Sequence, residues 1–214
     1  MNPELQRNLW LEFSIVRLVL VPLIGAFLCI AGWRVAGMPG LAWAAQATIW
    51  LILVLWGSRL AADSVLGEVG DRTWDSQRMS SISAWSMTWG KLVGGTLAAW
   101  AGAVLFVPVL IYAWLQYGDI SYEILGQLFL AGLYSQGVAL LVTLYMLRGR
   151  QQKVRFQVTV AQFLGILAGL QFGVLDQFFA VEGVVRWYGF AIEGSSFVLA
   201  VQAVFGFWLV VATH

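Results

Sequence analysis

Three carboxylates stand close together in a polar stretch of an otherwise apolar chain. They are Glu68, Asp71 and Asp75, which fall within eight consecutive residues, with Arg72 and Arg78 beside them. Carboxylate oxygens at this density could coordinate Mg²⁺. Two guanidinium groups compete for the same oxygens, however, because opposite charges three or four positions apart pair on one helix face. The pattern therefore favours an ion-paired helix that faces water over a metal site.

No other group of residues has the composition of a catalytic centre. The one histidine is His214, the last residue given, so histidine-based catalysis or metal binding would depend on a chain end. The single cysteine, Cys29, lies inside an apolar run and is typical of a small core residue. We therefore expect that this chain is not an enzyme by itself and binds no metal or cofactor of its own.

Polar side chains inside the apolar runs are candidates for a translocation path. The candidates are Gln46, Gln162, Gln171 and Asp176. Amides in membrane helices also bond to neighbouring helices, so helix–helix contact is an equally open interpretation for the glutamines. Asp176 is either a rim residue in water or a functional group on a path. No series of carboxylates crosses the apolar runs, which argues against a transporter driven by ions.

The composition is typical of an integral membrane protein. Of 214 residues, 60% are hydrophobic and 11% are charged, and the mean hydropathy is +0.80. That is more apolar surface than a soluble core of this length could bury. A helix of about 20 apolar residues crosses a hydrocarbon core of roughly 30 Å, and several runs are long enough. The net charge of +1, with its basic residues scattered, indicates no nucleic-acid partner.

The apolar runs predict an all-α protein with six membrane-spanning helices in a single transmembrane domain, residues 1–214. The expected spans are residues 15–33, 41–60, 92–115, 124–147, 157–180 and 195–213. Residues 2–14 are predicted to form an amphipathic helix at the membrane interface, or a helical extension of the first span into water. Residues 61–91 form the polar segment after the second span. Residues 181–194 form an amphipathic link whose Trp187 and Tyr188 suit the headgroup zone.

The positions of lysine and arginine predict the orientation. With the N-terminus inside, ten basic residues face the cytoplasm and two, Arg34 and Arg186, face outward. The ten are Arg7, Arg17, Arg59, Arg72, Arg78, Lys91, Arg148, Arg150, Lys153 and Arg155. Because cytoplasmic links carry the excess of positive charge, both termini and the 61–91 segment are expected inside the cell.

A row of glycines in the fifth span predicts close helix packing. Gly165, Gly169 and Gly173 recur every four residues and lie on one face, where another backbone can approach. The partner is either another helix of this chain or a second protomer, and the spacing favours neither.

The segment EVGDRTWDSQRMSSISAWSMTWGK, from Glu68 to Lys91, resembles the equivalent segment of type-2 ABC transporter permeases, the membrane subunits of exporters. In that family a glutamate after the second span precedes a threonine and an acidic residue, a short helix, a serine-containing turn and a Gly-Lys that opens the third span. The matching residues are Glu68, Thr73, Asp75, Ser81, Ser83, Gly90 and Lys91. Arg72 stands where the family often has glycine, and Gln77-Arg78 replaces an apolar pair, so the register or the partner could differ.

The resemblance implies an exporter in the cytoplasmic (inner) membrane of a bacterium, where lipid surrounds the chain. Two permease subunits, identical or different, would bind two ABC ATPase subunits. The coupling helix at 64–79 would contact the ATPase through Glu68, Asp71, Arg72, Asp75 and Arg78. ATP and Mg²⁺ would belong to that partner, because this chain has no GxxxxGK[ST] motif. The alternative is a non-transporting scaffold or assembly factor that binds a partner through the 61–91 loop.

Overall fold

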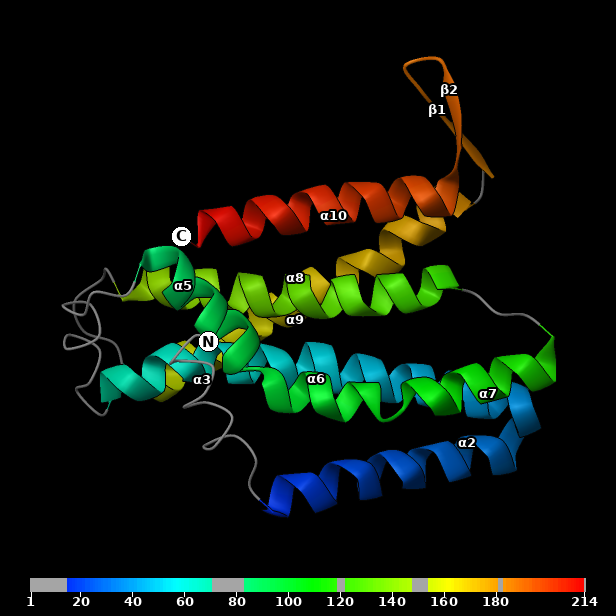
Figure 1. Cartoon of the computed structure of the whole chain (residues 1–214), viewed down its shortest axis with the longest axis horizontal. Helices are drawn as coiled ribbons and strands as arrows, with labels where there is room; N and C mark the ends of the chain where they lie inside the picture. Colours follow the sequence, from blue (N-terminus) through cyan, green and yellow to red (C-terminus); the bar gives the residue numbers. More distant parts are fainter. Residues whose placement is uncertain (1–14, 71–82, 119–121, 148–153, 181–182, 214) are drawn as a thin grey trace.

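The computed structural model describes residues 15–70, 83–118, 122–147, 154–180 and 183–213. Helices make up nearly all of these residues and run along one common direction (Figure 1). The elements in order are α2 (Ile15–Trp50), η1 (Leu51–Trp56), α3 (Gly57–Gly70), α5 (Ala84–Trp89), η2 (Gly90–Gly94), α6 (Leu97–Val104), α7 (Val107–Tyr117), α8 (Tyr122–Met146), α9 (Val154–Ala180), β1 (Val184–Trp187), β2 (Phe190–Glu193) and α10 (Gly194–Ala212).

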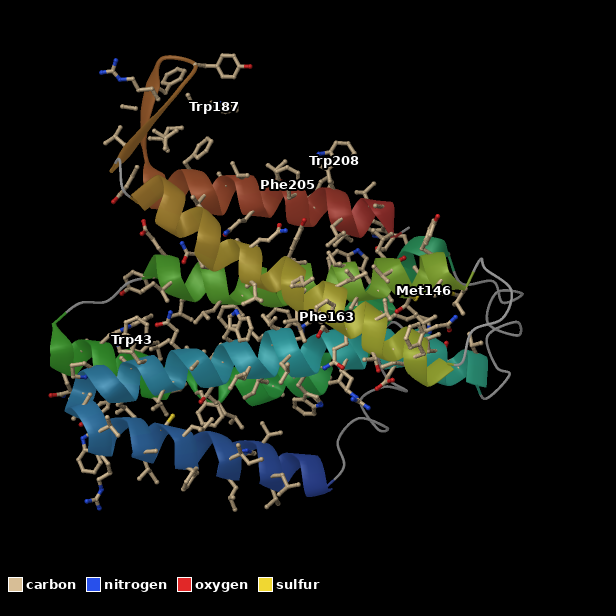
Figure 2. All side chains as sticks on the ribbon, turned by 180° about the vertical axis from the view of Figure 1, so that it is seen from behind. Trp43, Met146, Phe163, Trp187, Phe205 and Trp208 are labelled. Atoms are coloured by element: carbon tan, nitrogen blue, oxygen red, sulfur yellow. The ribbon has the colours of Figure 1, made fainter. Side chains whose placement is uncertain are left out.

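Three helical stretches in the described ranges are long and apolar enough to cross a membrane. They are Val19–Gly70, Leu97–Gln116 and Tyr122–Met146, and two shorter apolar helices cover Phe156–Gln171 and Ser196–Ala212. Large apolar side chains point outward from these helices, among them Trp43, Phe163, Phe205 and Trp208 (Figure 2). Such a surface suits a hydrocarbon surrounding, because in water it would be an exposed apolar patch. The structure is therefore compatible with the membrane protein that the composition predicts.

The chain reverses direction inside α2, within the link predicted between the first two spans. Ala36 and Gly37 leave the helical conformation, and Gly37 has a φ of +64°, which glycine adopts without steric cost. The two limbs pack closely, because a Cβ on Gly40 would lie 2.9 Å from the carbonyl carbon of Gly32. The bend and the β-hairpin lie at one end of the bundle, and the end of α3 lies at the other (Figure 1).

Both ends of the polar segment predicted at residues 61–91 belong to helices of the bundle. The second helix continues through α3 to Gly70, and the third begins with α5 at Ala84. Buried apolar residues on one face explain the extension: Ala62 and Leu66 pack with Val158 and Ala161 of α9. Most of the predicted helix at 64–79 lies outside the described residues, as do Asp71, Arg72, Asp75 and Arg78.

The predicted third span is a helix in pieces. The backbone leaves regular helix at Gly95–Thr96, between η2 and α6, and again at Leu105–Phe106, between α6 and α7. The Thr96 hydroxyl donates to the carbonyl of Leu92 at the first break. A proline in the first turn of α7 explains the second, because proline donates no N–H and suits a helix start. By contrast α8 and α9 are uninterrupted and match the predicted runs 124–147 and 157–180 closely.

The all-α prediction is wrong for the link at 181–194. Strands β1 and β2 pair antiparallel there, from Val184 opposite Glu193 to Trp187 opposite Phe190. Tyr188 and Gly189 form the two-residue turn, with φ values of +47° and +87°. Positive φ at both positions matches the right-handed twist of the strands and is typical of tight hairpins. The hairpin stands beyond the start of α10 (Figure 1).

Candidate functional site

A buried ion pair joins Glu68 of α3 to Lys91 of η2. The Lys91 ammonium on η2 donates to Oε2 of Glu68 on α3, and its Nζ lies 3.4 Å from the carbonyl oxygen of Ser64. The side chains are only 4% and 11% exposed. The sequence predicted that Glu68 lies in an ion-paired helix that faces water. Glu68 is helical and ion-paired, but it is buried, because its face of α3 packs against η2.

The ion pair ties the C-terminal part of α3 to η2. Separating buried charges is costly, since a buried charge left without its counter-ion costs about 3–5 kcal/mol. Apolar contacts reinforce the junction, because Val65 of α3 and Leu92 of η2 share a core with Leu140 of α8 and Val210 of α10. The ends of α3 and η2 are therefore held as one unit.

A second ion pair on α3 lies on the exposed surface. Arg59 Nε is 3.6 Å from Asp63 Oδ2, and both side chains are about half exposed. The two residues stand four apart and lie on one face of the helix. Exposed pairs stabilise by only about 0–1 kcal/mol, so removing one partner here should cost far less than removing one partner of the buried pair.

A hydrogen-bond network built on Gln136 crosses the centre of the bundle. The Gln136 side chain is fully buried, and its Nε2 donates to the carbonyl of Leu53 in η1 over 3.0 Å. Its Oε1 accepts from Trp100 Nε1 of α6 at 3.0 Å. The approach requires Gly57, because a Cβ there would collide with the Gln136 amide. Gln136 is not among the residues that the sequence offered as candidates for a path.

The π-helix η1 explains why amides gather at this place. A π-helical turn bonds i to i+5, so the change of register frees carbonyls that a regular helix would use. In an apolar bundle other groups must supply donors to such carbonyls. Gln162 Nε2 of α9 donates to Leu55 O at 3.0 Å, and the Ser58 hydroxyl donates to the same oxygen at 3.2 Å. Gln136 and Gln162 therefore stabilise the irregular backbone of the second helix.

Among the described side chains, the three predicted path glutamines lie in different surroundings. Gln162 faces η1, Gln46 is half-buried on α2, and Gln171 is exposed on α9. The side chain of Asp176 lies outside the described ones. Across the described ranges, no three His, Cys, Asp or Glu side chains lie close enough to share a metal ion.

Comparisons with known proteins give no indication of what this site does. No family model, curated protein or solved structure matches the chain. The buried ion pair, the amide network and the residues around them are therefore the features from which a function can be inferred.

Two of the three glycines in the α9 row pack against other helices of this chain. A Cβ on Gly165 would lie 2.6 Å from the Ser135 carbonyl oxygen of α8 and 3.1 Å from Ser58 Cβ of α3. A Cβ on Gly169 would lie 2.7 Å from Val54 of η1. These two glycines thus bring α9 against both α8 and the second helix. The surroundings of Gly173 lie outside the described side chains.

Replacing Gly165 by alanine is expected to lower the thermal stability of the purified protein. The added methyl group would overlap the Ser135 carbonyl, and overpacking of this kind costs roughly 1–2 kcal/mol. Gly206→Ala on α10 is the matched control, because its nearest neighbour would be 4.0 Å away. Unfolding temperatures in one detergent measure the difference. Equal unfolding temperatures for the two variants would contradict close packing at Gly165.

Proposed function

We propose that this chain is the membrane subunit of an ATP-driven exporter of the type-2 ABC permease kind. The observation that carries the proposal is the buried ion pair between Glu68 and Lys91, which ties α3 to η2. A segment that receives force from a partner must be fastened to the helices that it moves. The ion pair connects the helices in this way. It joins Glu68 and Lys91, the first and last residues of the segment that resembles the family.

The proposed path of the force runs from the 71–82 segment through α3 to α9. A push on this segment reaches α3 and η2 together, because the ion pair resists separation. Ala62 and Leu66 of α3 pack on α9, so a tilt of α3 also moves α9. In this mechanism Glu68 positions the helices, while Asp71, Arg72, Asp75 and Arg78 contact the ATPase.

The proposed assembly has six spans with both termini in the cytoplasm of a bacterial cell. The excess of basic residues at one set of links supports this orientation. The ends of α3 and α5 then face the cytoplasm, where two ATPase subunits hold ATP and Mg²⁺. A second permease subunit completes the membrane part, and the β-hairpin and the bend of α2 lie on the outer side.

Purification from native membranes in mild detergent tests the proposal. We expect an ABC ATPase to be recovered in near-equal amount, with vanadate-sensitive ATP hydrolysis. Reversing a charge in Asp75→Arg or Arg78→Glu should reduce the coupled hydrolysis roughly tenfold, as loss of about 1.4 kcal/mol of contact energy would. Arg186→Glu on the hairpin is the control and should leave hydrolysis unchanged. Recovery of other proteins without any ATPase would overturn the exporter and favour the scaffold.

A further inference from the structure

An apolar cavity of about 400 Å³ lies between α2 and α7, near the bend of α2. Its walls are formed by Cys29, Ile30 and Trp33 of the first limb and by Phe106, Val109 and Tyr112 at α7. The volume falls within the range of about 300–1,000 Å³ typical of ligand pockets. None of the residues that line it is charged. The chemistry of the walls therefore suits a hydrocarbon chain.

The cavity opens sideways, toward the region that lipid tails would occupy. Ile30, Trp33 and Tyr112 are each about half exposed, although they line the cavity. They lie on helices that are apolar enough to cross a membrane. A ligand would therefore enter from the bilayer and not from water.

Arg34 is a cation next to Trp33, one of the residues that line the cavity. The guanidinium carbon of Arg34 lies 5.8 Å from the ring centroid of Trp33, which is one of the lining residues. Arg34 is exposed, and within the described ranges its guanidinium has no carboxylate partner. Guanidinium groups bind phosphate through two parallel hydrogen bonds. An apolar cavity with a phosphate-binding group at its edge matches the two parts of a phospholipid.

We propose that this cavity binds an anionic phospholipid, with an acyl chain between α2 and α7 and the phosphate on Arg34. A net negative headgroup is favoured, because a zwitterionic one brings a cation of its own close to the guanidinium. The site does not depend on the exporter proposal. It requires only the described helices and a surrounding bilayer.

Photo-crosslinking in lipid nanodiscs tests the site. The purified full chain is placed in phosphatidylcholine nanodiscs with a minor fraction of phosphatidylglycerol that carries a diazirine on its acyl chain. After illumination, mass spectrometry should locate adducts on Cys29, Phe106 or Tyr112. The same probe with a phosphocholine headgroup should label these residues roughly tenfold less, because its choline cation lies close to the Arg34 guanidinium and opposes binding.

Two pairs of variants separate the cavity from the general lipid surface. Val109→Trp fills the cavity and should abolish the adducts, whereas Val104→Trp on an exposed position of α6 should not. Arg34→Gln should reduce phosphatidylglycerol labelling roughly tenfold, whereas Arg186→Gln on the hairpin should leave it unchanged. Adducts spread evenly over outward residues such as Phe27 would overturn the site. Cavity adducts that are insensitive to Arg34→Gln would overturn the anionic headgroup.

Discussion

Replacing Lys91 by methionine is expected to lower the free energy of unfolding by about 3–5 kcal/mol, the cost of breaking a buried ion pair from one side. Methionine keeps most of the volume of the side chain but removes the cation that the buried Glu68 carboxylate contacts. For a chain of this length the unfolding temperature should fall by roughly 10 °C. Differential scanning fluorimetry in one detergent, at one heating rate, measures the change.

Two further variants show whether charge or packing causes the loss. Glu68→Gln combined with Lys91→Met removes both charges and should recover most of the stability, because apolar replacements of a whole buried pair are often nearly neutral. Arg59→Met breaks the exposed pair with Asp63 and should cost at most about 1 kcal/mol. If Lys91→Met proved as mild as Arg59→Met, the ion pair could not hold α3 to η2.

Replacing Gln136 by leucine is expected to have the second largest effect. The substitution keeps a side chain of similar size but removes the amide that donates to Leu53 O from the centre of the bundle. The freed carbonyl of η1 then lies in an apolar surrounding, which costs roughly 2–3 kcal/mol. Trp100 is less affected, because its Nε1 also donates to Thr96 Oγ1 at 3.1 Å. The unfolding temperature in detergent again measures the loss.

Two other glutamines provide graded controls for Gln136. Gln162→Leu should cost less, because the carbonyl of Leu55 keeps the Ser58 hydroxyl as a donor. Gln46→Leu changes a half-buried amide on α2 and should be nearly neutral. The expected order of destabilisation is Gln136, then Gln162, then Gln46. A different order would show that the π-helix does not depend on these amides.

Apolar run length predicted the later helices well. The runs at 124–147 and 195–213 correspond to α8 (Tyr122–Met146) and α10 (Gly194–Ala212), because a long apolar run has few other ways to satisfy its backbone. Charge misled the prediction for the second helix. Glu68 looked exposed because its cation is Lys91, 23 residues later, and local polarity does not reveal so distant a partner.

Two other features, the role of Gln136 and the β-hairpin, could not be predicted from sequence patterns. The importance of Gln136 depends on a backbone carbonyl in η1, and a π-helical turn has no side-chain signature of its own. Small residues on α8 around this glutamine, Gly132 and Gly137, were the available signal for a tightly packed face. The β-hairpin was missed because its strands have only four residues each, too few for alternation to stand out.

The donors to η1 also constrain the order in which the protein can be completed during synthesis. Leu53 and Leu55 receive their amides from residues 83 and 107 positions further along the chain. When the second helix first enters the membrane, neither α8 nor α9 has been made. The nascent segment must then either hold those carbonyls in a regular α-helix or keep water beside them. The π-helical form becomes stable only after the fourth and fifth apolar runs arrive, so the N-terminal half of the protein cannot reach its final structure before they do.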